Sequence, residues 1–180
     1  SAQPVFLATW SPDGAYIAGL NAGWHDSVTE LVIWDANTGT VVHRISLGKT
    51  GIDALGNQIL VGDVIDFAWS PDGSTIAVGT SLKVSFWNVP GFDRRLTSEY
   101  VFPLRMAWSP DGEVVAVTTG SNQAIHLIDK NTGLIVDTIP TELHVRNVAW
   151  NPNGTQLVYT GDTEQTLSFF DIYTLSTASA

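Results

Sequence analysis

Five residues, Trp-Ser-Pro-Asp-Gly, recur along this chain and constrain its fold more than any other feature. They occur three times unchanged and once as Trp-Asn-Pro-Asn-Gly, starting at Trp10, Trp69, Trp108 and Trp150. Successive copies begin 59, 39 and 42 residues apart. Two intervals near forty residues, and one that is longer by about twenty, indicate a repeat architecture with a single insertion.

Each copy has the chemistry of a tight turn between two strands. Proline fixes φ at the first central position, aspartate suits the next, and glycine accepts a positive φ. The residues before the turn are largely apolar, as in 64–69, and those after it are β-formers, as in 75–79. The repeated unit is therefore predicted to be strand, turn and strand.

Composition limits the classes of protein that fit. The chain has 180 residues, 44% of them hydrophobic, which suits a turn-rich globular β protein. Its net charge of −10, from 8 basic and 18 acidic side chains, argues against binding a nucleic-acid backbone. Because there is no cysteine, disulfides and thiolate chemistry are excluded. No apolar run is long enough for a membrane span and no leader peptide is visible, and the compartment, cytoplasmic or exported, stays open.

Each repeat has room for four strands, and no segment shows helical periodicity. The long interval contains a Gly-rich segment, 48–63, which is interpreted as a long loop or a small extra hairpin. The predicted strands are 5–10, 15–20, 29–35 and 41–47; 64–70, 75–80, 83–88 and 95–102; 104–109, 114–119, 124–129 and 134–139; and 145–151, 156–160 and 166–171, with only 172–180 left for a last strand.

A second signal recurs at the third strand of each repeat. It reads Ile33-Trp34-Asp35, Phe86-Trp87-Asn88, Leu127-Ile128-Asp129 and Phe169-Phe170-Asp171, and two copies run on as Asp-x-Asn-Thr-Gly. Together with Trp-Ser-Pro-Asp-Gly, this pattern resembles the WD-repeat (Trp-Asp repeat) β-propeller family in a divergent, bacterial-type form. The Gly-His pair that precedes the first strand in that family is absent. Aromatic and aliphatic packing is therefore expected to hold the blades together.

The resemblance implies an all-β fold: a β-propeller with four WD-like blades of four antiparallel strands. The expected division is into blades at about 5–47, 64–102, 104–139 and 145–180, with an insertion at 48–63. Family members usually close with seven blades, so four blades form an incomplete ring. We expect further blades or a second copy of the chain to complete it, with a portion of a larger propeller favoured.

Six of the seven Trp residues occupy repeat positions and are expected in the core between blades. Trp24 is the exception, in the loop 21–28. In propellers of this family, that loop emerges on the same face as the connection 48–63. The candidate protein-binding residues on this face are Trp24, His25, Asp26, Ile52, Asp53 and Leu55, because Trp is a frequent interface anchor. The alternative is that Trp24 packs against 48–63 as local core.

Enzyme signals are weak. The histidines are isolated, with His43 and His126 interpreted as structural, and no nucleophile elbow or phosphate-binding loop occurs. A run of acidic residues, Asp53, Asp63, Asp66 and Asp72, suggests a cation or basic-partner site, with solvated loop charges as the favoured reading. No catalytic, cofactor or metal residue is predicted.

The predicted function is a non-enzymatic protein–protein interaction scaffold that binds a protein or peptide through the face carrying 21–28 and 48–63. The alternative is a regulatory or substrate-gating propeller of a larger hydrolase or peptidase-type protein. A hydrolase domain adjoining this segment would favour the alternative.

Overall fold

The structure is a computed structural model that describes residues 5–21, 30–46, 49–52, 58–61, 64–99, 101–120, 123–142, 144–161 and 167–172. For Phe6, Ser46 and the residues of 49–52 and 58–61, it describes the backbone alone. All regular elements in these ranges are strands, paired antiparallel.

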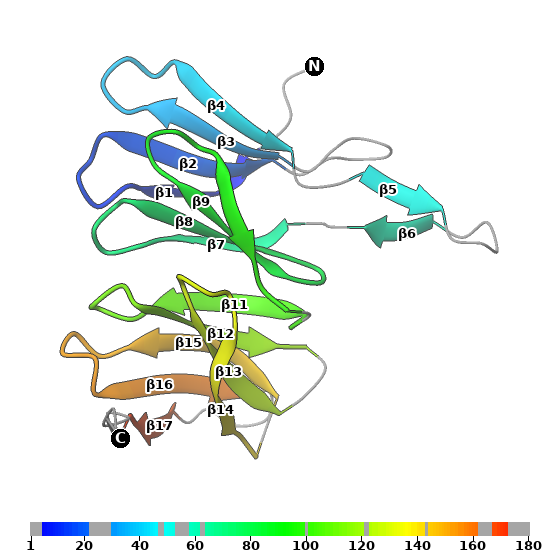
Figure 1. The fold of residues 1–180 in the computed structure, drawn as a ribbon, viewed down its shortest axis with the longest axis vertical. Helices are drawn as coiled ribbons and strands as arrows, with labels where there is room; N and C mark the ends of the chain where they lie inside the picture. The colour runs from blue at the N-terminus through cyan, green and yellow to red at the C-terminus, as the bar shows by residue number, and fades with distance from the viewer. Residues whose placement is uncertain are drawn as a thin grey trace.

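The strands form four successive sheets, or blades, which do not close into a ring (Figure 1). The first three blades have four strands each and the fourth has three, while a separate two-stranded hairpin lies between blades one and two. The blades comprise β1 (Val5–Trp10), β2 (Tyr16–Asn21), β3 (Glu30–Asp35) and β4 (Val41–Ser46); β7 (Val64–Trp69), β8 (Thr75–Thr80), β9 (Val84–Asn88) and β10 (Arg94–Thr97); β11 (Pro103–Trp108), β12 (Val114–Thr119), β13 (Ala124–Asp129) and β14 (Ile135–Pro140); and β15 (Val145–Trp150), β16 (Gln156–Gly161) and β17 (Leu167–Asp171).

The predicted all-β propeller fold is thereby confirmed. The insertion contains β5 (Lys49–Ile52) and β6 (Gln58–Val61), so of the two interpretations of 48–63 the extra hairpin is correct. The fourth strand predicted for the last blade falls mainly on 173–180, outside the described residues. In blade two, β10 ends at Thr97, earlier than the prediction that it continues to Phe102.

The strands stack into blades because both of their faces are apolar. Along β8, Ile76 and Val78 pack toward blade one, while Ala77 packs toward blade three. Side chains of a strand alternate between two faces, so a strand with apolar residues on both must be covered twice. The described core accordingly consists of three layers, one between each pair of successive blades.

The Trp-Ser-Pro-Asp-Gly turns have the predicted geometry. In blade two, the Gly73 amide donates to the Ser70 carbonyl at 2.9 Å, and the Ser70 amide donates to the Thr75 carbonyl at 2.8 Å. The turn glycines Gly14, Gly73, Gly112 and Gly154 have φ between 71° and 74°. The prediction that these glycines adopt a positive φ is therefore confirmed.

The turn between the third and fourth strands differs in blade two. In blades one and three, Gly39 and Gly133 take a positive φ of 68° and 72°. In blade two the residue with positive φ is Phe92, at 51°, rather than the neighbouring Gly91. The Phe92 ring is buried against blade one, stacked on His43 at 5.2 Å and edge-on to Tyr16 at 5.5 Å. This aromatic packing offsets the backbone strain of a non-glycine residue at positive φ.

The expectation that all six repeat Trp residues lie between blades is wrong for Trp10. Trp69 and Trp108 are 8% exposed, whereas Trp10 is 59% exposed. The physical reason is that Trp69 and Trp108 each pack in the core layer shared with the preceding blade, whereas Trp10 belongs to blade one, which no other described blade precedes. Trp34, Trp87 and Trp150 are half-buried.

Candidate functional site

The blades have two chemically different ends. At the turn end lie the three Trp-Ser-Pro-Asp-Gly turns and the Trp-Asn-Pro-Asn-Gly turn, on the left in Figure 1. At the opposite end, the loop end, β2 runs into 22–29 and β4 runs into the insertion with its hairpin β5–β6.

The residues predicted to bind a partner come from the segments 21–28 and 48–63. Trp24, His25, Asp26, Asp53 and Leu55 lie outside the described residues. Ile52 ends β5, and the structure describes its backbone only. The interpretations of Trp24, as an interface anchor or as local core, thus both remain predictions.

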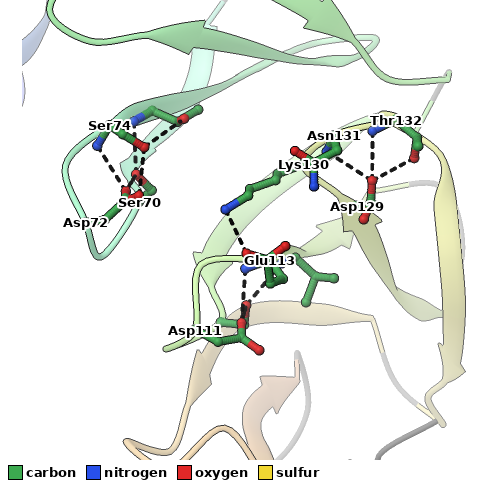
Figure 2. A network of polar contacts seen from close by, with 12 residues as sticks. Ser70, Asp72, Ser74, Asp111, Glu113, Asp129, Lys130, Asn131 and Thr132 are labelled. Carbon is green, nitrogen blue, oxygen red and sulfur yellow. Dashed lines mark hydrogen bonds and ion pairs between the residues drawn. The ribbon is translucent and has the colours of Figure 1, made fainter. Parts of the chain in front are cut away.

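At the turn end, polar side chains bond to one another and to their own turns (Figure 2). The Ser70 hydroxyl donates to Asp72 Oδ1 at 2.5 Å, and the Ser74 amide donates to the same oxygen at 3.0 Å. These donors stabilise the carboxylate, the Ser70 hydroxyl most, and lower the pKa of Asp72 to about 2. Asp111 is held in the same way by Ser109 and by the Glu113 amide. The turn-end carboxylates are therefore structural.

Lys130 connects the acidic side chains of this end (Figure 2). Its Nζ lies 2.9 Å from Glu113 Oε1, and its amide donates to the Glu113 carbonyl. Its charge also contributes to lowering the pKa of Asp72 and of Asp111. Lys130, Glu113, Asp72 and Asp111 thus interact with one another or with their own turns.

Asp66 does not have the role of a solvated loop charge or of a cation ligand. It is buried in β7, where Oδ1 accepts from the Phe67 amide at 3.0 Å and Oδ2 from the Met106 amide at 2.9 Å. The second bond connects blade two to blade three. Burial raises the pKa of the Asp66 carboxyl. Asp53 and Asp63 of the same acidic run lie outside the described residues, and no group of three metal-binding side chains occurs in the described part.

At the loop end, a cavity of about 180 Å³ opens between blades three and four. Its described lining is Leu104, Thr119, Gly120, His144, Val145 and Arg146. Leu104 and Arg146 fall at the register shift in β11 and in β15, where a β-bulge interrupts the pairing. Such bulges redirect a side chain relative to its strand. No carboxylate is present among the described lining residues, although the chain is acidic.

Arg146 belongs to no sequence motif, and His144 is isolated in the sequence. The two side chains are brought beside Leu104 and Thr119 of the preceding blade by the stacking of the blades. A bulge of this kind occurs in all four first strands, but no sequence motif marks it. Only the tertiary arrangement therefore identifies this cavity.

A second cavity, of about 370 Å³, lies between the first strands of blades one and two. Leu7, Thr9 and Trp10 line one side of it, and Phe67 and Trp69 the other. The Trp69 indole nitrogen is buried and has no hydrogen-bond partner. β1 and β7 approach each other less closely than β7 and β11 do. The junction between blades one and two is therefore the looser one.

The histidines within strands are structural, as the sequence predicts. The His126 imidazole is largely buried, and its Nδ1 lies 3.0 Å from the Thr138 hydroxyl. Burial lowers the pKa of His126, so its neutral form is favoured. His43 stacks on Phe92 in the first core layer.

Comparison with known proteins agrees with this geometry. Residues 137–171 match the WD40 family, described as WD domain, G-beta repeat. The matched segment begins in β14 and ends with β17, so one sequence repeat combines the last strand of a blade with the first three of the next. No curated protein sequence matches the chain.

Two solved structures are similar in fold. Kuenenia stuttgartiensis hydrazine synthase has a TM-score of 0.73 at 24% identity, over 95% of this chain and 47% of that one. The Cps50 (Swd1) β-propeller domain of Myceliophteria thermophila has a TM-score of 0.74 at 14% identity, over 95% of this chain and 55% of that one. The chain thus spans about half the length of the structures it matches.

The blades and turns define the class: the described part of this chain is a β-propeller fold of four blades that do not close into a ring, and one of its repeats, 137–171, matches the WD40 family. Propellers of this type generally mediate protein–protein interaction and are generally non-catalytic. Hydrazine synthase is an enzyme by its name, but at 24% identity the likeness extends to the fold alone. Within the described residues, no helix has the length and apolarity that crossing a membrane requires.

Proposed function

We propose that this chain is a non-enzymatic scaffold that binds a protein or peptide through its loop end, at 21–28 and 48–63. The observation that carries the proposal is the contrast between the two ends of the blades. At the turn end, side chains such as Asp72 and Glu113 are bonded within the chain. At the loop end, the described part contains a cavity of about 180 Å³.

The chemistry of the cavity suits a peptide. Arg146 and His144 supply side-chain nitrogen donors, and Leu104 and Val145 supply apolar surface. A small set of polar groups within an apolar lining is typical of sites that fix the orientation of a ligand. The insertion 48–63, with its hairpin, extends the same end beyond blade one (Figure 1).

Paired arginine substitutions test which end binds. Arg146 lies in β15 at the loop end, and Arg94 begins β10 at the turn end, and both are exposed. We expect Arg146→Gln to weaken binding of a partner captured by the wild-type chain and then purified, and Arg94→Gln to leave it unchanged. Equal affinities of wild type and Arg146→Gln, measured by calorimetry, would remove the loop-end cavity from the binding site.

Trp24→Ala tests the predicted anchor. If Trp24 is an anchor, the variant melts like the wild type and loses partner binding, because truncating an interface Trp costs about 2 kcal/mol or more. If Trp24 is local core, the variant loses about 3–5 kcal/mol of stability instead. Trp87→Ala serves as the control for misfolding. Normal melting together with normal binding would contradict both interpretations.

A further inference from the structure

Phe102, at the loop end of blade three, combines a strained backbone conformation with an exposed side chain. Its φ is 47°, in the left-handed region that residues with a bulky side chain rarely adopt. Phe92, the other non-glycine residue with positive φ among those described, is 7% exposed and packs on His43, whereas Phe102 is 44% exposed. Burial therefore compensates for the strain at Phe92 but not to the same degree at Phe102. Strained residues of this kind cluster at binding sites.

Hydrogen bonds fix the backbone on both sides of Phe102. The amides of Val101 and Phe102 donate to the Leu82 carbonyl at 3.0 Å and 3.3 Å. The Phe102 carbonyl accepts from the Gly120 amide at 3.3 Å. Gly120 lines the loop-end cavity of about 180 Å³, and so does Leu104, two residues after Phe102. These bonds therefore hold Phe102 beside the cavity.

The two blades that form the cavity present different chemistry at equivalent positions. The residue before β11 is Phe102, and the residue before β15 is His144. The residues at the register shifts of the same strands are Leu104 and Arg146. Blade three thus offers two apolar side chains, and blade four offers two side chains with nitrogen donors, both exposed. The cavity therefore lies between an apolar pair and a donor pair.

The size and charge of the cavity favour an acidic side chain of a peptide. Its volume is smaller than that of pockets for small molecules, about 300–1,000 Å³, so it suits one side chain rather than a whole ligand. The Arg146 guanidinium is always charged and matches the two oxygens of a carboxylate. Glu142, two residues before His144, is not among the lining residues, and the described lining contains no carboxylate. Phosphate groups are bound by clusters of arginine, and the described lining has one arginine.

We propose that the loop-end cavity binds an Asp or Glu side chain of a peptide, and that Phe102 packs against an apolar residue next to it. Arg146 and His144 donate to the carboxylate. The Phe102 ring is held exposed because it contacts the partner, and aromatic side chains are frequent anchors of such contacts. The inference rests on the proposed function, since it specifies the chemistry of the peptide that the loop end binds.

Selection from a random peptide library tests the inference. Linear peptides displayed on phage are selected on the full wild-type chain and then synthesised, and calorimetry measures their affinities. We expect the selected sequences to share an Asp or Glu next to an apolar residue. We expect Arg146→Gln and Phe102→Gly each to weaken binding of such a peptide about tenfold or more, as the loss of an interface anchor does.

Two variants at the turn end are the matched controls. Arg94→Gln removes an exposed arginine, and Leu134→Ala removes a side chain that is 53% exposed, next to the β13–β14 turn. Both should leave the peptide affinity unchanged. Because glycine adopts a positive φ without strain, Phe102→Gly should melt no lower than the wild type. Unchanged peptide binding by Phe102→Gly would overturn the role of the ring, whatever its melting temperature.

A charge exchange identifies the group that Arg146 binds. Replacing the acidic residue of the peptide by Lys should weaken binding to the wild type, and Arg146→Glu should restore it. A failure of Arg146→Glu to restore binding would overturn the inference, and so would a library that yields no binding peptide.

The outcomes also separate this inference from the proposed function. Peptides whose affinity depends on Arg146 but which contain no acidic residue would overturn the inference and leave binding at the loop end in place. Peptides that bind the wild type, Arg146→Gln and Phe102→Gly equally would contradict the inference and the use of this cavity in the proposed function.

Discussion

The indole nitrogen of Trp108 lies 3.0 Å from the carbonyl oxygen of Ala68, across the junction between blades two and three. Trp150 and Ala107 repeat this bond at the next junction. The Trp69 indole, at the corresponding position of blade two, is buried and has no partner. The Trp of the repeat therefore contributes an indole hydrogen bond at two junctions and packing alone at the junction between blades one and two.

The substitution Trp108→Phe is expected to cost about 1 kcal/mol more stability than Trp69→Phe. Both residues are 8% exposed, so the loss of packing is similar. Only Trp108→Phe removes a hydrogen bond, and such a bond contributes about 1 kcal/mol. Urea unfolding of the two variants measures the difference, and equal losses would show that the indole bond contributes nothing.

Gly112→Ala is expected to destabilise the chain by about 1–2 kcal/mol, because a residue with a Cβ resists positive φ. Gly112 has φ 71°, and an added Cβ would lie at an ordinary contact distance of 3.5 Å from Pro71. The strain thus comes from the backbone and not from a clash.

Gly120→Ala is the control for this turn. Its Cβ would meet Leu104 at 3.6 Å, also an ordinary contact, and Gly120 is not among the residues with positive φ. We expect a change within about 0.5 kcal/mol. Equal melting temperatures of Gly112→Ala and Gly120→Ala would show that the positive φ of Gly112 is not the reason why the turn requires glycine.

Acid should remove the stabilisation that Asp72 provides. Its folded pKa is about 2, below the usual 3.8, chiefly because the Ser70 hydroxyl donates to it. A carboxyl with a depressed folded pKa stabilises the fold above its unfolded pKa, and this contribution is lost as the pH falls through the folded value. Asp72→Asn should therefore lower stability at neutral pH and converge with the wild type between pH 3.8 and about 2.

Urea unfolding over a pH series measures this convergence. Asp66→Asn provides a contrast of opposite sign, because burial raises the folded pKa of Asp66. The free energy that Asp66 contributes to folding therefore increases as the pH falls from its folded pKa toward its unfolded pKa of 3.8. In Asp66→Asn this increase is absent. A constant gap between Asp72→Asn and the wild type across the series would contradict the role of the Ser70 bond.

The turns were predictable because their physics is local. Proline, aspartate and glycine act on a few adjacent dihedral angles, so Ser70 to Gly73 can be interpreted from the sequence alone. Phe92 shows the limit of this reasoning. The sequence Pro90-Gly91 places glycine in the turn, yet Phe92 takes the positive φ because its ring packs on His43 of another blade.

The candidate site shows the same limit of local reasoning. The predicted binding residues lie in the segments 21–28 and 48–63, which follow from the spacing of the repeats, and they stay predictions. The cavity with His144 and Arg146 was not predicted, because its walls come from strands of two blades. In the sequence, Asp66 is one acidic residue among several. Its structural role depends on the Met106 amide, forty residues later in the chain, which donates a hydrogen bond to it.

By itself, the sequence determined that this protein is all-β, that it repeats, and where its turns lie. Those features follow from side-chain periodicity and turn chemistry, which act over a few residues. Only the tertiary structure decided which repeat residues are covered. Trp10 and Trp69 occupy the same place in the repeat, but one is exposed and the other is buried, because burial depends on whether a neighbouring blade packs against that face.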